Sequence, residues 1–386
     1  MQVELDGARH DSAARPPKFT RQLRNLVLLT DDLSSGREVW QSHPYTIECT
    51  TKNICNLRCR HCAQHDGIEP IKRERAETER ILDQLLPEGG VLDPFALSEP
   101  FAGDLDLCLR KCEEHDAYLN LITNATLLTE EKLRRVMPRV ARFFISIESH
   151  HKTDFEALRI GARFEKVEAN SRLAARIARE HNVPITFVTI LMRPMVRDLP
   201  EYVAWVADLG GEHVNVLELL PTYPRYAEHC LEGHVTQEEL LDIRRRAFAV
   251  ARERNIGITI NLPPPVGGGV GRVDPPPRVI YVELAQMAHA EIFRQFGHFC
   301  SHAASYVKVD LDGTVYPCCR SPRELQMGNI NEQPFDEIWN GARYRELRRR
   351  MQTGDLPECC KGCGVLVGTP YYHEPGAPVP SNSDAA

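Results

Sequence analysis

Short apolar runs alternate with longer amphipathic stretches along the chain from residue 45 to residue 260. The short runs predict β-strands, and the stretches between them predict helices. A chain that alternates strands and helices forms a parallel sheet, either open or closed into a barrel. The expected strands lie at residues 45–50, 94–97, 119–122, 143–147, 185–191, 214–217 and 256–260.

Two of the helices carry terminal signals. Asp198 precedes Leu199-Pro200 and is expected to cap a helix that Gly210-Gly211 ends. Thr236, followed three residues later by Glu239, predicts a capping box at the start of another helix.

The alternation stops after residue 260. Residues 261–278 hold two Pro-Pro-Pro runs and a Gly-Gly-Gly run, which exclude a helix or a central strand. The glycine run lacks the Lys-Ser/Thr of a phosphate-binding loop, so we interpret the segment as a linker or as a loop over an active site. Asp312-Gly313 then separates two strand-like runs, 305–310 and 314–318, and predicts a hairpin. A helix is expected from about 335 to 351.

These patterns divide the chain into five parts. They are an N-terminal extension at 1–43, an α/β barrel at 44–262, a Pro/Gly-rich linker at 263–280, a small α+β domain at 281–374 and a disordered tail at 375–386.

Composition narrows the possible partners. No run approaches the roughly 20 apolar residues of a membrane helix, and the polar N-terminus lacks a secretion signal, so a cytoplasmic location without membrane contact is expected. The net charge of −7 disfavours nucleic acid as a partner. Thirteen cysteines in a chain without an export signal favour metal binding over disulfides.

Three of the cysteines form a tight motif. Cys55, Cys59 and Cys62 have the spacing C-x3-C-x2-C directly after the first expected strand. Three thiolates on one loop would leave one iron of a four-iron cluster open, as a catalytic centre requires. The spacing alone also allows a buried helix face, a zinc site that includes His61, or a closed cluster completed by a distant cysteine.

A C-x3-C-x2-C motif after the first strand of a βα domain resembles the radical S-adenosylmethionine (SAM) superfamily. The resemblance implies a partial (β/α)6 TIM-like barrel with a [4Fe–4S] cluster whose open iron binds SAM. It also implies reductive cleavage of SAM to a 5′-deoxyadenosyl radical, with a flavodoxin- or ferredoxin-type electron donor. His61 stands where the family usually has another aromatic residue.

Further SAM contacts follow from the same resemblance. Glu99, in Leu97-Ser98-Glu99-Pro100, matches the glutamate that holds the SAM amino group. Alternation along the strand places Ser146 and Glu148 on one face, toward the lumen of a barrel, although an exposed edge strand would show the same pattern. Arg193 could bind the SAM carboxylate bidentately. The resemblance assigns the SAM site to Ser98, Glu99, Pro100, Asn124, Ser146, Glu148 and Arg193.

A second set of six cysteines lies at residues 300–363. The thiols alone would suit either metal: the cysteines near the expected hairpin and those of the C-x2-C segment could together enclose an iron–sulfur cluster or a structural zinc ion. The spacing, together with Gly328-Asn329-Ile330, resembles the SPASM/twitch extension of radical SAM enzymes. The resemblance implies an auxiliary [4Fe–4S] cluster in the shorter, one-cluster twitch form. Its implied ligands are Cys300, Cys318, Cys360 and Cys363.

The remaining cysteines have weaker assignments. Cys319 is expected either to pack or to act as a hydrogen-atom donor, and Cys359 is expected to pack. Cys108 and Cys112, four residues apart, are expected on one face of a helix as core residues.

The expected function is a radical SAM oxidoreductase. Only 54 residues precede Cys55, fewer than a leader-peptide-binding domain needs, which favours a small polar substrate such as a sugar or aminocyclitol. The auxiliary cluster would accept an electron from the substrate radical. A redox-neutral epimerase, a SPASM-type peptide maturase and a non-enzymatic zinc or iron–sulfur interaction module are the alternatives.

Overall fold

The computed structural model describes residues 20–65, 71–94, 98–219, 226–261, 271–273, 300–319 and 321–361. Several expected features therefore lie outside the described residues. They are most of the strand expected at 94–97, most of the linker, the ligand candidate Cys363 and the tail.

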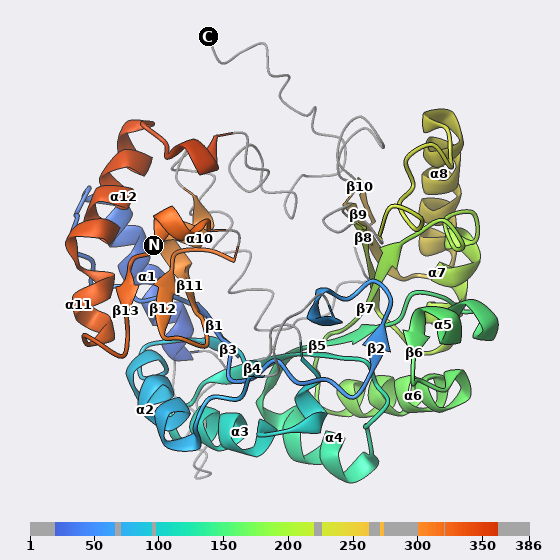
Figure 1. The fold of residues 1–386 in the computed structure, drawn as a ribbon, viewed down its shortest axis with the longest axis horizontal. Coiled ribbons are helices and arrows are strands. Elements are labelled where there is room, and N and C mark those ends of the chain that lie inside the picture. The colour runs from blue at the N-terminus through green and yellow to red at the C-terminus, as the bar shows by residue number, and fades with distance from the viewer. Residues whose placement is uncertain are drawn as a thin grey trace, which may run out of the picture.

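An eleven-stranded sheet forms the centre of the fold, in the order β10-β9-β8-β7-β5-β4-β3-β1-β11-β12-β13 (Figure 1). Adjacent strands from β9 to β11 are parallel, and β10, β12 and β13 are antiparallel to their neighbours. The parallel strands are β1 (Thr46–Cys49), β3 (Val91–Asp93), β4 (Tyr118–Thr123), β5 (Val140–Ser146), β7 (Ile185–Leu191), β8 (His213–Glu218), β9 (Gly257–Asn261) and β11 (Tyr306–Val309). The others are β10 (Gly271–Val273), β12 (Thr314–Tyr316) and β13 (Gly328–Asn329), and a separate pair is β2 (Arg58–Cys59) with β6 (Arg159–Ile160).

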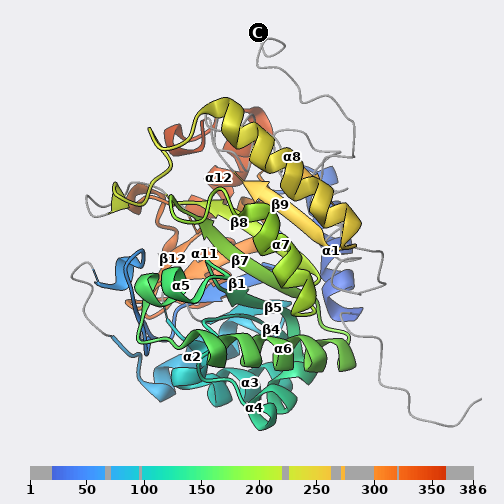
Figure 2. The same ribbon diagram turned by 90° about the vertical axis from the view of Figure 1, so that its right-hand side faces the viewer.

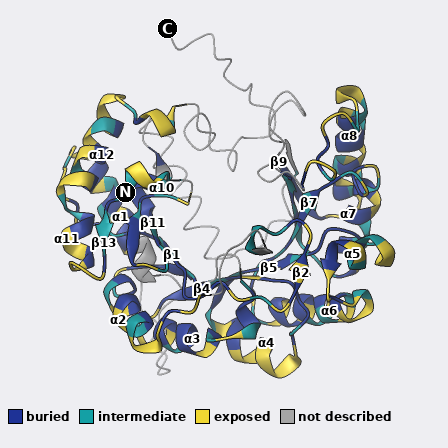
Figure 3. Ribbon diagram, in the orientation of Figure 1, coloured by how far each residue is buried: buried dark blue, intermediate teal, exposed yellow. Residues whose placement is uncertain are grey.

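Helices cover the convex face of the sheet, which curves into an open barrel (Figures 1 and 2). On β5, Phe143 and Ile145 are fully buried under this layer, whereas Arg142, Phe144 and Ser146 are partly exposed on the concave face (Figure 3). The expected partial TIM-like barrel is confirmed. The barrel helices are α2 (Arg75–Leu85), α3 (Leu105–Glu114), α4 (Glu130–Val136), α5 (Lys152–Leu158), α6 (Phe164–Glu180), α7 (Leu199–Asp208) and α8 (Gln237–Glu253), with 3-10 turns η1 (Ala63–His65), η2 (Pro100–Ala102) and η3 (Met137–Arg139).

Two local expectations need correction. Strand β3 ends at Asp93, before the residues expected, because Pro94 lacks the N–H that would continue the ladder. The expected helix 335–351 is two helices, α11 (Phe335–Trp339) and α12 (Ala342–Thr353). The helix is interrupted near Gly341, where a Cβ would lie 2.7 Å from the carbonyl oxygen of Glu337.

The two expected caps differ in outcome. Thr236 Oγ1 accepts a hydrogen bond from the N–H of Glu239 at 3.1 Å, which confirms the cap. Asp198 precedes α7 but makes no side-chain capping bond; its carboxylate lies 3.4 Å from His151 Nε2 instead.

The C-terminal domain continues the barrel sheet. Strand β11 pairs in parallel with β1, and the hairpin β11–β12 turns at Gly313, whose φ of +83° favours glycine. The short helix α10 (Ser301–Ser305), the turns η5 (Arg323–Leu325) and η6 (Glu358–Cys360), and helices α11 and α12 complete this domain.

The N-terminal extension packs on the C-terminal domain through an aromatic cage. The fully buried guanidinium of Arg348 lies 4.0 Å from the ring centre of Trp40 and 4.5 Å from that of Trp339. Arg348 also donates to the carbonyl oxygen of Glu38 at 3.0 Å. Helix α1 (Thr20–Ser34) precedes this contact, so chain segments 300 residues apart form one packing unit.

Removing the caged side chain should destabilise the protein. Arg348→Ala would leave a cavity and abolish the cation–π contacts, so we expect a loss of about 2–5 kcal/mol in the free energy of unfolding. The neighbouring Arg349, which is half exposed and paired with Glu346, provides the control. Arg349→Ala should change the free energy by no more than about 0.5 kcal/mol in the same urea titration. Equal effects of the two variants would show that the cage contributes nothing.

Candidate functional site

The loop of Cys55, Cys59 and Cys62 follows β1 at the carboxyl end of the barrel strands, where parallel α/β folds place their sites. A short antiparallel pair holds the loop, because β2 places Cys59 opposite Arg159 of β6. The N–H of Arg60 also donates to the carbonyl oxygen of Leu158 at 2.9 Å.

Loops from the next two strands fix the other side of the cysteine loop. Asn56 donates to Thr126 Oγ1 at 2.9 Å and accepts from Asn124 Nδ2 at 3.1 Å. The N–H of Glu99 donates to the carbonyl oxygen of Ile54 at 3.0 Å. The segments that follow β1, β3 and β4 therefore converge around the three cysteines and bring Glu99 and Asn124 to the cysteine loop.

The three thiols lie close together in a partly buried setting. The charge on each of Cys55 and Cys62 acts on the pKa of Cys59, and burial raises that pKa to about 12. Burial also raises the pKa of Cys55, whose Sγ lies 3.5 Å from the N–H of Leu57 and 3.7 Å from Asn124 Nδ2. A metal replaces such protons on binding, and N–H donors then stabilise the thiolates. This donor set fits an iron–sulfur cluster held by three cysteines.

Glu99 is buried at the centre of the convergence. Its carboxylate accepts hydrogen bonds from Thr123 Oγ1 at 2.8 Å, from the N–H of Asn124 at 2.8 Å and from the N–H of Phe101 at 3.2 Å. The neighbouring Ser98 Oγ is buried and has no hydrogen-bond partner among the described residues. A free buried hydroxyl beside a buried carboxylate fits the binding of a small polar cofactor such as SAM.

Replacing this carboxylate tests its predicted role. Glu99→Gln should weaken SAM binding by about 1.5–3 kcal/mol, the range for a hydrogen bond to a charged group. Thr123→Val removes one of the same internal hydrogen bonds without changing the charge, and it should weaken binding less. Anaerobic equilibrium dialysis with SAM measures both. If Glu99→Gln binds SAM as the wild type does, Glu99 has no such role.

A buried ion pair lies on the opposite side of the cysteine loop. Arg159 Nη2 lies 2.6 Å from Glu148 Oε1, a second contact joins Arg159 Nε to the same carboxylate, and His61 Nε2 lies 3.3 Å from it. Burial alone would raise the pKa of Glu148, but Arg159 and His61 outweigh it and lower that pKa below its usual value. Glu148 is therefore ionised and tied to the cysteine loop.

Arg159 was missed at the level of sequence. It follows a short helix with no motif around it, and only the pairing of β6 with β2 reveals its place beside Cys59. The Arg193 guanidinium, which the sequence assigned to SAM, donates to the carbonyl oxygens of Cys230 at 2.5 Å and Glu232 at 3.3 Å. Ser146 is on the concave face of β5, and buried Pro100 begins the turn η2. The SAM roles of these residues stay predictions.

The second cysteine set also converges. Burial raises the pKa of Cys360 to about 12, and the neighbouring Cys359, Cys300 and Cys318 add to this rise. Cys300 precedes α10, Cys318 follows β12 and Cys360 is in the turn η6, so three parts of the domain supply them. Three of the four predicted auxiliary ligands are thus neighbours, and the fourth, Cys363, is outside the described residues.

The cysteines next to the predicted auxiliary ligands are exposed. Cys319 and Cys359 both face solvent, and Cys359 Sγ lies 4.0 Å from Cys360 Sγ. The hydrogen-donor role of Cys319 stays a prediction. Cys108 and Cys112 are fully buried on α3, as expected of core residues.

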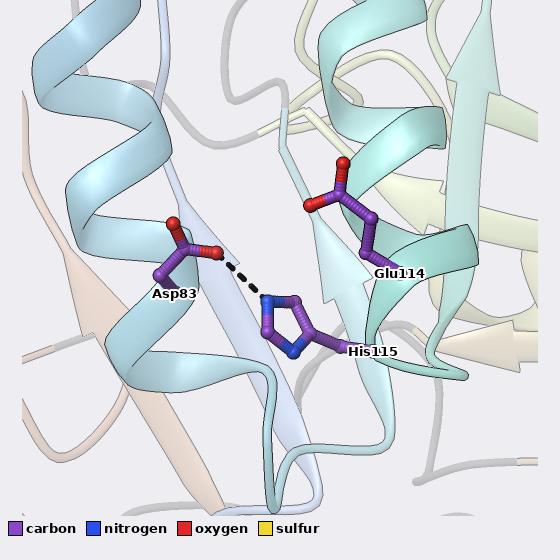
Figure 4. Close-up of side chains that lie close together, drawn as sticks. All are labelled: Asp83, Glu114 and His115. Carbon is purple, nitrogen blue, oxygen red and sulfur yellow. Dashed lines mark hydrogen bonds and ion pairs between the residues drawn. The ribbon is translucent and has the colours of Figure 1, made fainter.

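A different cluster resembles a metal site but has its own cation. Asp83, Glu114 and His115 lie together on the surface (Figure 4). The ammonium of Lys111 is 2.8 Å from both Asp83 Oδ1 and Glu114 Oε2, and His115 Nε2 is 2.8 Å from the same Asp83 oxygen. We interpret the group as a surface ion-pair network.

No helix in the described part of the chain has the length and apolar character needed to cross a membrane.

Family models match both halves of this architecture. The model of the radical SAM superfamily matches residues 50–206, and that of the SPASM iron–sulfur cluster-binding domain matches residues 300–364. Two curated relatives align over most of the chain. A "PqqA peptide cyclase" of Granulibacter bethesdensis is 23% identical over 80% of this chain and 76% of its own. An "AdoMet-dependent heme synthase" of Methanosarcina barkeri is 24% identical over 81% and 85%.

Solved structures share the fold. Streptococcus suis SuiB bound to the precursor peptide SuiA has a TM-score of 0.56 at 14% identity, over 95% of this chain and 79% of SuiB. The structure anSMEcpe with bound AdoMet has a TM-score of 0.54 at 16% identity, over 84% of each chain. Together with the two converging cysteine sets, the two family-model matches show that the chain belongs to the radical SAM superfamily and carries a C-terminal SPASM-type iron–sulfur domain.

Proposed function

We propose that this protein is a radical SAM peptide maturase, which modifies a side chain of a peptide substrate. The observation that carries the proposal is the similarity to a PqqA peptide cyclase over 80% of the chain. The fold of SuiB, solved with its precursor peptide, supports the same class of substrate. A small polar metabolite was expected mainly from the number of residues before Cys55. The relatives that carry the present proposal do not support that substrate class.

The cysteine loop would hold the SAM-binding cluster in this reaction. A [4Fe–4S] cluster that is reduced by one electron and has SAM bound would supply a 5′-deoxyadenosyl radical, able to take a hydrogen atom from the substrate. Asn56, Asn124 and Arg159 fix the position of the loop, and Glu99 and Ser98 offer polar groups to SAM. The second cysteine set would hold the auxiliary cluster in the domain whose strand β11 pairs with β1.

The concave face of the barrel would receive the peptide. Its wall is built from the alternate side chains of the parallel strands, which are partly exposed, whereas their neighbours are buried under the helices. Among the inward residues, Ile122 of β4 is 44% exposed. An apolar side chain that faces an open barrel interior is typical of a binding surface.

The test uses the reconstituted protein, SAM and dithionite with short peptides encoded beside its gene. Mass spectrometry should detect 5′-deoxyadenosine together with a peptide changed in mass, in amounts that rise together. A panel of sugars and aminocyclitols is the comparison. If a sugar is oxidised and no peptide changes, the protein is a small-molecule oxidoreductase and the proposal is wrong.

A further inference from the structure

Polar side chains occupy neighbouring register positions on one wall of the barrel. Glu48 of β1 is in register with Asp93 of β3 on one side and with Lys308 of β11 on the other. The register of β3 with β4 places Asp93 beside Asn120, which in turn pairs with Arg142 of β5. A polar row therefore crosses five adjacent strands.

This row faces the inside of the barrel. On β1, Ile47 and Cys49 are buried beneath the outer helices, whereas Glu48 between them is partly exposed. Residues in register on adjacent strands point to the same face of a sheet. Glu48 and Asp93 lie near the carboxyl ends of their strands, and the cysteine loop begins a few residues after Glu48.

The acceptors in the middle of the row lack internal donors. The hydroxyl of Tyr306 donates to Glu48, and Lys308 Nζ is 2.9 Å from Asp310. The carboxylate of Asp93, by contrast, makes no hydrogen bond or ion pair with any residue that the structure describes, and only burial and the charge of Glu48 act on it there. The Oδ1 atom of Asn120 is buried and also has no partner within the described ranges. Unsatisfied acceptors in a low-dielectric interior are costly unless a ligand supplies donors.

The negative charges of Glu48 and Asp93 also favour a positively charged ligand. Burial, together with the charge of Glu48, raises the pKa of Asp93 to about 7. Among the described residues, Glu48 is the charged group that acts on Asp93, whereas Lys308, which pairs with Asp310, acts on Glu48. A bound cation would offset the repulsion between the two carboxylates.

We propose that Glu48, Asp93 and Asn120 bind a positively charged side chain of the peptide substrate, an ammonium or a guanidinium. This inference rests on the proposed function and specifies its substrate. The three acceptors are spread along the sheet at the spacing of about 4.8 Å between strands. That linear arrangement suits a group with several N–H donors better than the compact shell of a metal ion.

The surroundings suit the rest of such a side chain. Ile122, two residues after Asn120 on β4, presents an apolar surface for a methylene stem. Tyr306 joins the row to the C-terminal domain, because its hydroxyl donates to Glu48 from strand β11. A basic side chain held by Glu48 and Asp93 would therefore lie on the part of the barrel wall that this domain continues.

Binding of two matched tripeptides tests this inference. Acetyl-Gly-Lys-Gly-amide and its norleucine counterpart differ only by the ammonium group, and anaerobic equilibrium dialysis with the reconstituted protein measures each. The lysyl peptide should bind about tenfold more tightly, which corresponds to about 1.4 kcal/mol. The double variant Glu48→Gln, Asp93→Asn should reduce this preference to less than about twofold.

Two controls separate charge from folding. Tyr306→Phe removes the hydrogen bond to Glu48 but keeps both carboxylates, so the preference for lysine should survive. Glu113→Gln changes a carboxylate on the outer surface that pairs with Arg135, and it should leave the preference unchanged. Equal binding of the two peptides, binding of neither, or a lysine preference that persists in the double variant would overturn the inference.

The dialysis uses no radical chemistry, so its result is independent of the proposed reaction. A protein that modifies peptides without preferring the lysyl probe would refute this subsite alone. A protein that prefers the lysyl probe but oxidises only sugars would keep the subsite and refute peptide maturation.

Discussion

Changing Cys55, Cys59 and Cys62 together to alanine should abolish the formation of 5′-deoxyadenosine from SAM. The three thiols converge on one loop, and the charges of Cys55 and Cys62 both act on Cys59. The variant should contain about four fewer irons per chain, because the second cysteine set keeps its own cluster. Iron assay and chromatography of the reaction with dithionite measure both quantities.

The control for this experiment is a cysteine outside both sets of ligands. Cys359 is exposed and adjacent to Cys360, so Cys359→Ala should keep the iron content and the SAM cleavage of the wild type. Continued formation of 5′-deoxyadenosine by the triple variant would contradict the assignment of the cluster. Loss of all iron from that variant would show that the auxiliary cluster depends on the first.

Removing the guanidinium of Arg159 should have the largest effect on stability. Arg159→Met leaves the carboxylate of Glu148 buried with only His61 beside it. Breaking one side of a buried ion pair costs about 3–5 kcal/mol, because an uncompensated charge remains. The apparent midpoint of urea unfolding, followed by circular dichroism, should fall accordingly.

A double variant separates the charge from the packing. Replacing both partners, with Arg159→Met and Glu148→Leu, removes the uncompensated charge and should recover at least about half of the lost stability. The exposed pair of Arg135 and Glu113 is the comparison. Arg135→Met should cost no more than about 1 kcal/mol. If the double variant is less stable than Arg159→Met alone, packing and not charge dominates at this site.

Much of the barrel could be predicted from the sequence because its strands are strongly patterned. Residues 185–191 are a strand with the bounds expected, since a run of β-branched and aromatic residues is bounded on both sides by loops. The strand at β3 is three residues long and less distinct, and the sequence placed it too late. Short strands carry too little pattern to fix their ends.

Some residues of the candidate site could be predicted from the sequence and others could not. The spacing of Cys55, Cys59 and Cys62 identified the cluster loop, because the ligands are contiguous in the chain. Arg159 could not be found in this way, since its position depends on the pairing of two-residue strands far apart in sequence. The polar row of Glu48, Asp93 and Asn120 likewise exists only through the register of neighbouring strands.

The choice of substrate class also depended on more than the chain itself. The number of residues before Cys55 favoured a small metabolite, but SuiB, which was solved with a precursor peptide, has a similar fold. The fold therefore does not decide the substrate; the side chains on the concave face do.

Electron paramagnetic resonance of the dithionite-reduced protein shows whether the first cysteine set holds a cluster with an open iron that binds SAM. We expect signals from two reduced clusters, of which one changes when SAM is added, and that one should be missing from the triple cysteine variant. If SAM leaves the spectrum unchanged, the first cysteine set does not hold a SAM-binding cluster.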